Sequence, residues 1–108
     1  MRHVATLTEP VLLILLSLAD QPRHGYALLK DIEALSNGRV RLSTGTLYGA
    51  LRRLLEYRWI ARFDQPDTSR DKQAYKLTAE GQKQLQKELE RMKQLTRAAN
   101  LRLRAREA

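Results

Sequence analysis

The chain has 108 residues and a formal net charge of +8, from 20 Lys and Arg against 12 Asp and Glu. This length allows one small core and little more, so a catalytic cleft would be hard to enclose. The absence of cysteine excludes disulfides and thiolate metal sites, and it favours the cytoplasm. The apolar run at 11–16 is too short for a membrane span or a secretory signal, so we expect no targeting segment and no membrane partner.

The basic excess is unevenly placed along the chain. Residues 1–38 hold three basic and four acidic residues, residues 39–78 hold nine and four, and residues 79–108 hold eight and four. Such a positive field attracts polyanions, of which nucleic acid is the commonest. An anionic membrane is the competing partner, because the last predicted helix partly fits a membrane-surface helix.

Two helices are predicted in the first third of the chain. The first has Thr8 as its N-cap, Pro10 in its opening turn, and an end near residue 19. Its centre, VLLILL, is apolar on every side, so we expect its own domain to cover one face and a second chain another. The second helix spans about 25–36 and ends in a left-handed turn at Asn37 and Gly38.

The third helix, STGTLYGALRRLLE at 43–56, divides into two faces. The helical period puts its leucines on one buried stripe and two arginines on the opposite side, together with Tyr48 and Gly49. Ser43 is the predicted N-cap, and the free amides of the first turn would attract phosphate. We interpret this segment as a helix for DNA, although any surface helix shows an apolar stripe opposite a charged face.

A hairpin is predicted after the third helix. Short strands at 60–64 and 72–77 flank the turn-rich segment QPDTSRD. Three helices followed by a hairpin form a winged helix-turn-helix, in which the third helix enters the major groove and the hairpin tip lies on the flanking backbone. Basic residues flank that helix on both sides, at Arg39 and Arg41 before it and at Arg70 and Lys72 in the wing.

The last predicted helix follows Thr78, its expected N-cap, and extends beyond the compact part of the chain. Its apolar residues repeat in steps of three and four, which is typical of a seam for a partner helix. The alternative is packing back onto its own domain, but we favour a dimer because the other elements already bury one another. The expected dimer interface combines both apolar helices: Val11, Leu12, Leu15, Leu85, Leu89, Met92, Leu95, Ala99 and Leu103.

Three motifs in this order resemble the PadR family of bacterial transcriptional regulators. They are HGYALLKDI at 24–32, STGTLYGALRRL at 43–54 and YKLTAEGQKQL at 75–85. The chain resembles the short subgroup, which has the winged domain and a single C-terminal helix. This resemblance implies a homodimeric repressor whose last helix forms the dimer interface, often together with the first. It also implies regulation by small aromatic or drug-like molecules in some members.

The resemblance assigns roles to individual residues. The start of the third helix, Thr44 to Tyr48, carries the family motif, with Ser43, Tyr48 and Arg52 facing DNA. Gly45 fits either a close approach to phosphate or a tight start of the helix. Gly25 is expected to allow the turn into the second helix, and His24 to satisfy neighbouring backbone. Tyr26 and Tyr75 are expected to pack in the core or the wing.

Two positions depart from the family pattern. Arg58 stands where glycine commonly ends the third helix, so we expect a strained left-handed residue or a different helix end. Met92 occupies the position of an aromatic that drug-sensing members use for stacking. This argues against flat aromatic effectors and leaves Leu89 and Met92 as an adaptable apolar effector pocket.

The sequence therefore predicts a mainly α fold with a small β-hairpin, made of a winged helix-turn-helix at 1–78 and a dimerisation helix at 79–108. The predicted function is a homodimeric repressor that binds a pseudo-palindromic operator in double-stranded DNA and is released by a small hydrophobic effector. We expect no enzyme, cofactor or metal site. The alternative is a protein interaction module that uses the last helix and has no specific DNA target. The expected DNA-binding residues are Arg39, Arg41, Ser43, Thr44, Gly45, Thr46, Tyr48, Arg52, Arg53, Arg70 and Lys72.

Overall fold

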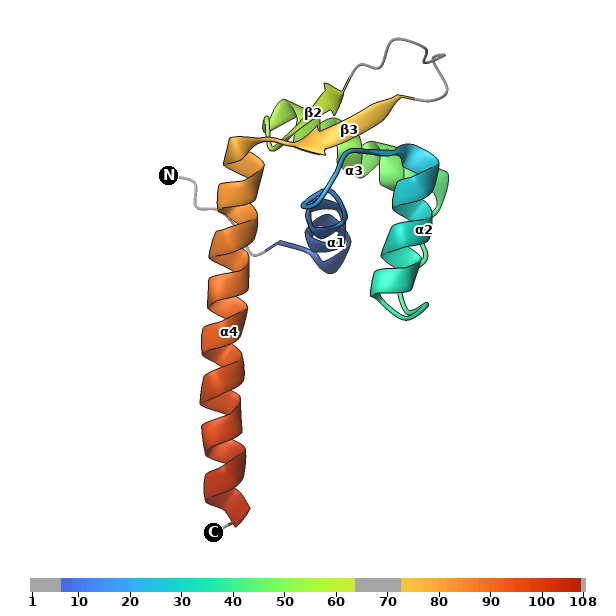
Figure 1. Ribbon diagram of the computed structural model, residues 1–108. Helices are drawn as coiled ribbons and strands as arrows, with labels where there is room; N and C mark the ends of the chain where they lie inside the picture. The colour runs from blue at the N-terminus through green and yellow to red at the C-terminus, as the bar shows by residue number, and fades with distance from the viewer. Residues whose placement is uncertain (1–6, 64–72, 108) are drawn as a thin grey trace.

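The computed structural model describes residues 7–63 and 73–107. Three helices come first, a small sheet follows, and a long helix ends the chain (Figure 1). This confirms the mainly helical fold class that the sequence predicts. The elements are α1 Glu9–Ser17, β1 Arg23–His24, α2 Gly25–Leu35, α3 Thr44–Glu56, β2 Ile60–Phe63, β3 Ala74–Leu77 and α4 Ala79–Glu107.

Hydroxyl side chains cap three of the helices, as predicted. Thr8 Oγ1 accepts a hydrogen bond from the Val11 amide at 3.3 Å, and Ser43 Oγ accepts one from the Thr46 amide at 3.1 Å. Thr78 Oγ1 accepts from the Gly81 amide at 3.0 Å. Each cap satisfies an amide that lacks a partner within its own helix, so these residues fix where α1, α3 and α4 begin.

Left-handed residues end α2 and α3. Asn37 has φ 55° and Gly38 has φ 78°, which confirms the predicted turn after α2. Arg58 has φ 66°, so the strained alternative at the end of α3 is the correct one. The Thr78 hydroxyl donates a 2.7 Å hydrogen bond to the Arg58 carbonyl oxygen, which holds this turn against the start of α4.

The sheet contains one strand that the sequence analysis did not expect. β3 lies in the centre, with β2 on one side and β1 on the other. The predicted hairpin is present, because β2 and β3 pair antiparallel from Ile60 opposite Leu77 to Phe63 opposite Ala74. β1 has only two residues, too few to show a periodicity, and only its pairing with Tyr75 and Ala74 identifies it as a strand.

One apolar core joins α1, α2, α3 and the sheet. Its fully buried side chains include Ile14, Leu28, Leu47 and Ile60, one from each of these elements. In Figure 1, α1 lies between α2 and α4, beneath the sheet. The domain covers one face of α1, as expected, while Val11, Leu12 and Leu16 stay partly exposed.

α4 leaves the core after its first turns. Gly81 packs against the backbone of Trp59, and a side-chain Cβ at this position would lie 2.9 Å from the Trp59 carbonyl carbon. Leu85 and Glu88 are buried, but from Leu89 onward almost every side chain is exposed and the helix projects away from the domain (Figure 1). No helix in the described part of the chain is long and apolar enough to cross a membrane.

Candidate nucleic-acid interface

The two faces of α3 are separated as the sequence predicts. Leu47, Leu51 and Leu54 have exposed fractions of 1% or less, and they anchor the helix to the core. Leu55 is only half-buried, at the edge of that stripe. The opposite face is exposed over the first turn and again at Arg52 and Arg53. The core therefore fixes which side of α3 faces outward.

The first turn of α3 presents small polar side chains. The Ser43 hydroxyl is held within the turn, since it caps the helix and donates a 3.0 Å hydrogen bond to Thr46 Oγ1. Thr44 and Gly45 are exposed beside it. A Cβ added at Gly45 would meet nothing nearer than Ser43 Oγ at 4.0 Å, so no contact within the chain requires glycine there. Because its side chains are small and uncharged, a base edge or phosphate can approach the backbone of this turn closely.

Tyr48 is 42% exposed, but its hydroxyl group lies against the start of α2. It meets the chain at Gly25, where an added Cβ would lie 2.9 Å from Tyr48 Cζ and would collide with the hydroxyl oxygen. The chain turns from β1 into α2 at Gly25, as expected, but the backbone of this turn does not require glycine. Gly25 is not among the residues with positive φ, and what it provides is space for the tyrosine.

Two neighbouring expectations also need correction. Tyr26 does not pack in the core or the wing: it is 70% exposed on α2, with Lys30 Nζ 5.5 Å from its ring centre. Within the described residues the buried Nδ1 atom of His24 has no hydrogen-bond partner, so this nitrogen does not make the expected bond to neighbouring backbone. His24 belongs to β1, the strand that sequence patterns did not reveal, and Tyr26 follows it in the first turn of α2. Tyr75, in contrast, is 4% exposed and belongs to the core.

The arginines near α3 fall into two classes. Arg52 and Arg53 are exposed, and within residues 7–63 and 73–107 no carboxylate pairs with them. Arg39 pairs with Glu9 through both of its terminal nitrogens. Arg41 Nε lies 3.2 Å from a carboxylate oxygen of Glu33. Arg52 and Arg53 are therefore available to an anion without breaking an ion pair that the structure describes.

The sheet brings further basic residues that the sequence analysis did not single out. Arg62 on β2 and Lys76 on β3 are exposed, and Arg62 lies directly opposite the buried Tyr75. Burial raises the pKa of the Tyr75 hydroxyl, nearby Tyr48 raises it further, and Arg62 lowers it. Arg62 thus lies beside the hydroxyl-bearing side chain that β3 contributes to the core. The basic residues expected at the wing tip, Arg70 and Lys72, lie outside the described residues.

The residues expected at a dimer interface differ in how deeply a single chain buries them. Leu15 and Leu85 are 0% and 5% exposed in the core of a single chain, so they have little surface to offer a partner. Val11 and Leu12 are partly exposed on α1. The remaining five residues, Leu89, Met92, Leu95, Ala99 and Leu103, are exposed along α4. The apolar surface of α4 is therefore open beyond the domain.

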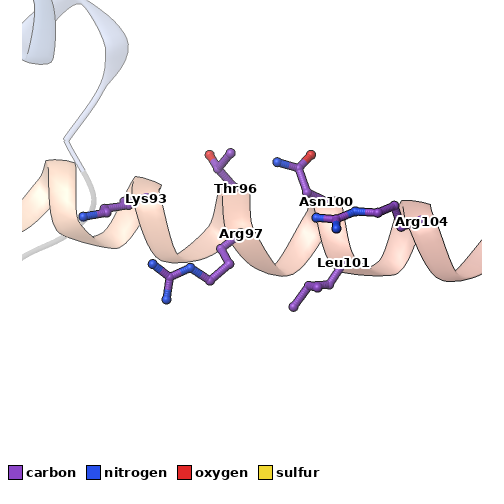
Figure 2. Close-up of a pocket in the computed structure, with 6 residues that line it drawn as sticks. All are labelled: Lys93, Thr96, Arg97, Asn100, Leu101 and Arg104. Atoms are coloured by element: carbon purple, nitrogen blue, oxygen red, sulfur yellow. The ribbon is translucent and has the colours of Figure 1, made fainter.

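The residues expected at the effector pocket lie on the exposed surface of α4. Leu89 and Met92 are 43% and 39% exposed on the side of α4. Further along the helix there is a shallow hollow, and Figure 2 shows that α4 alone supplies its lining. The lining residues are Lys93, Thr96, Arg97, Asn100, Leu101 and Arg104. Over the described residues, the acidic and histidine side chains form no cluster of three or more that could hold a metal ion.

Comparison with known proteins identifies the family. Residues 14–87 match the profile of the transcriptional regulator PadR-like family. An uncharacterized 37.1 kDa protein in transposon TN4556 of Streptomyces fradiae is 36% identical over 85 residues, which are 79% of this chain and 23% of that protein. The chain thus spans less than a quarter of that relative's length.

Solved structures agree with this fold. A PadR family transcription regulator from Clostridium difficile superposes with a TM-score of 0.72 at 23% identity, covering 89% of this chain and 99% of that one. A PadR family regulator from Eggerthella lenta superposes with a TM-score of 0.67 at 28% identity, covering 86% and 80%. From its sequence match and its winged-helix fold, the chain belongs to the PadR-like family of DNA-binding transcriptional regulators.

Proposed function

We propose that the protein is a homodimeric repressor that binds a pseudo-palindromic operator through α3. The observation that carries this proposal is the division of α3. Leu47, Leu51 and Leu54 are buried, while its first turn is presented outward together with Arg52 and Arg53, which pair with no carboxylate among the described residues. A helix held in this way is suited to the major groove, where small polar groups and guanidinium groups read base edges.

The residues on this surface take different roles. Thr44 and Thr46 in the first turn, together with Tyr48 and Arg52, face the bases and supply most of the sequence preference. Arg53, next to Arg52, contacts phosphate. Ser43 mainly holds the first turn in shape, since its hydroxyl is engaged as the cap. Gly45 lets the backbone approach closely.

The other basic residues add affinity without sequence preference. Arg70 and Lys72 contact phosphate from the wing, and Arg62 and Lys76, exposed on opposite faces of the strands, add positive charge nearby. Arg39 and Arg41 reach phosphate only by exchanging a carboxylate partner for it. Their net contribution is therefore smaller than that of an unpaired arginine.

A second copy of the chain is the proposed partner of α4. Leu89, Met92, Ala99 and Leu103 are spaced by three, seven and four residues, so they form one stripe along an otherwise polar helix. The partly exposed residues of α1, Val11 and Leu12, extend the interface toward the domain. Two-fold symmetry then places two α3 helices on half-sites about one helical turn apart.

A small hydrophobic effector is the proposed signal that releases the operator. Leu89 and Met92 offer flexible apolar side chains at the point where α4 leaves the core. One chain leaves them on an open surface, so an enclosed pocket requires side chains from the partner copy. Effector binding and dimer geometry would then be coupled.

Footprinting on the DNA upstream of the protein's own coding region tests the proposal. We expect protection of an inverted repeat whose halves are about one helical turn apart. Binding should weaken steeply with salt, by roughly three to five powers of ten between 50 and 200 mM, if the dimer neutralises about six to ten phosphates. A salt-independent affinity, or equal protection of all sequences, would contradict sequence-specific binding by this surface.

The exposed leucines of α4 favour a second candidate, an interaction module that binds another protein. Leu95, Leu101 and Leu103 are each more than half exposed. This function predicts a stable complex with a different protein and no retardation of any duplex in a gel. A gel-shift titration with random and upstream DNA, run beside size-exclusion chromatography, separates the two functions.

A further inference from the structure

The contact between Gly25 and Tyr48 joins two elements that the winged fold must hold at a fixed angle. Gly25 is the first residue of α2 and is buried, and Tyr48 lies in the second turn of α3. The absence of a side chain at Gly25 is what gives the Tyr48 hydroxyl its place, because an added Cβ would overlap it. The ring therefore folds back along α3 toward the start of α2.

Tyr48 is enclosed on one side and open on the other. Gly25 follows β1, and β1 pairs with β3 through His24 opposite Ala74. Because the Tyr48 hydroxyl lies against Gly25, Tyr48 sits beside the point where the chain passes from the sheet into α2. The rest of the side chain, 42% of its surface, remains exposed.

A side chain fixed in this way has a physical advantage in recognition. Ordering a flexible side chain on binding costs conformational entropy, and a side chain already held in place avoids most of that cost. A binding site also works only when its groups lie within about 0.5 Å of the productive position. The contact at Gly25 sets both the direction of the tyrosine ring and its distance from the axis of α3.

We propose that Gly25 is a positioning residue for DNA recognition, acting through Tyr48. This inference rests on the proposed function, in which the exposed face of α3 reads the operator. Any side chain at position 25 displaces the tyrosine outward, toward the DNA, or tilts α3 away from α2. In either case the first turn of α3 and Arg52 can no longer contact their base edges at the same time. Phosphate contacts made elsewhere persist.

The test is a double-mutant cycle with Gly25→Ala, Tyr48→Ala and the variant that carries both changes. Affinity for the footprinted operator and for a random duplex is measured by fluorescence anisotropy, and folding is measured by urea denaturation. Gly25→Ala should lower the ratio of operator to random affinity about tenfold, comparable to one mismatched base pair, with little change in random binding. The variant with both changes should have the same ratio as Tyr48→Ala alone, because the two residues act as one unit.

The folding measurement shows whether the effect passes through the tyrosine. Gly25→Ala should destabilise the wild-type background and should cost nothing in the Tyr48→Ala background, where the space is empty. Gly49→Ala is the matched control for stability, because its added Cβ meets nothing within 4 Å. If Gly25→Ala fails to fold, the variant with both changes still folds and is compared with Tyr48→Ala.

Two results would overturn the inference. One is an unchanged ratio of operator to random affinity in Gly25→Ala. The other is a decrease in that affinity ratio, or in stability, that Gly25→Ala still causes when Tyr48 is already replaced by alanine. Failure of the proposed function gives a different pattern, in which the wild-type protein itself does not distinguish the operator from a random duplex.

Discussion

The Arg39 guanidinium forms a two-armed ion pair with the Glu9 carboxylate, at 2.8 Å from Nη1 to Oε1 and 2.5 Å from Nη2 to Oε2. The pair joins the first residue of α1 to the connection between α2 and α3. It also neutralises a cation that lies just before the helix proposed to enter the groove. A carboxylate of the protein therefore competes with DNA phosphate for Arg39.

Removing the carboxylate should strengthen DNA binding. Glu9→Gln frees Arg39, so we expect the affinity for operator and random duplexes to rise alike, by about threefold at low salt. Glu56→Gln is the matched control, because it removes the same charge from the end of α3 without releasing an arginine that the structure describes as paired. Fluorescence anisotropy at two salt concentrations measures both. An equal gain in the two variants would mean that only net charge matters.

The same ion pair gives a pH dependence of stability. The hydrogen bond from Arg39 lowers the pKa of Glu9 below its ordinary value of 4.5. A carboxylate with a lowered folded pKa stabilises the protein above its unfolded pKa, and this contribution is lost as pH falls through the folded value. The difference in Tm between wild type and Glu9→Gln should thus be constant from about pH 6 to 8, shrink as pH falls past the ordinary Glu value of 4.5, and disappear once pH is below the lowered folded pKa of Glu9. A difference that grows in acid would exclude this pair as its source.

Neighbouring arginines on α3 should have separable effects. Arg52→Ala should lower operator affinity and relax sequence preference by about 1–3 kcal/mol, because a base-edge contact is lost. Arg53→Ala should weaken operator and random duplexes alike and reduce the salt dependence by about one phosphate. Anisotropy titrations against both duplexes measure the difference. Equal losses on both duplexes for both variants would show that neither arginine reads a base.

Arg58 should be a point where the fold can be stabilised. Its φ of 66° is unfavourable for a residue with a side chain, so Arg58→Gly should raise the free energy of unfolding by about 1 kcal/mol. Asn37→Gly is the control at φ 55°, where asparagine is tolerated and the gain should be smaller. Urea denaturation followed by Trp59 fluorescence measures both. Destabilisation by Arg58→Gly would show that contacts of the arginine side chain outweigh the backbone strain.

The face of α4 that pairs two chains can be identified with one leucine on each side. Leu103 continues the stripe formed by Met92 and Ala99, whereas Leu101 lines the hollow on another side of the helix (Figure 2). Leu103→Glu should place two carboxylates in the proposed seam and lower dimer affinity at least tenfold. Leu101→Glu, with a similar exposed fraction, should leave the dimer intact. Sedimentation velocity over a dilution series distinguishes these outcomes, and a monomeric wild type would refute the seam.

The sequence by itself determined the order of the main elements and the two faces of α3. Hydroxyl caps at Thr8, Ser43 and Thr78 and the period of the leucines are local signals, because each arises from contacts within one turn or one helix. The left-handed residues at Asn37 and Gly38 are local in the same sense. The motifs at 24–32, 43–54 and 75–85 then indicated the family.

Only the tertiary structure decided which groups near α3 are engaged. Arg39 and Arg41 look like Arg52 and Arg53 in the sequence, but their pairing with Glu9 and Glu33 depends on how α1 and α2 pack beside the connection to α3. β1 exists because β3 lies next to it, and Gly25 matters because Tyr48 reaches across from another helix. These contacts join residues far apart in the chain, so no periodicity records them.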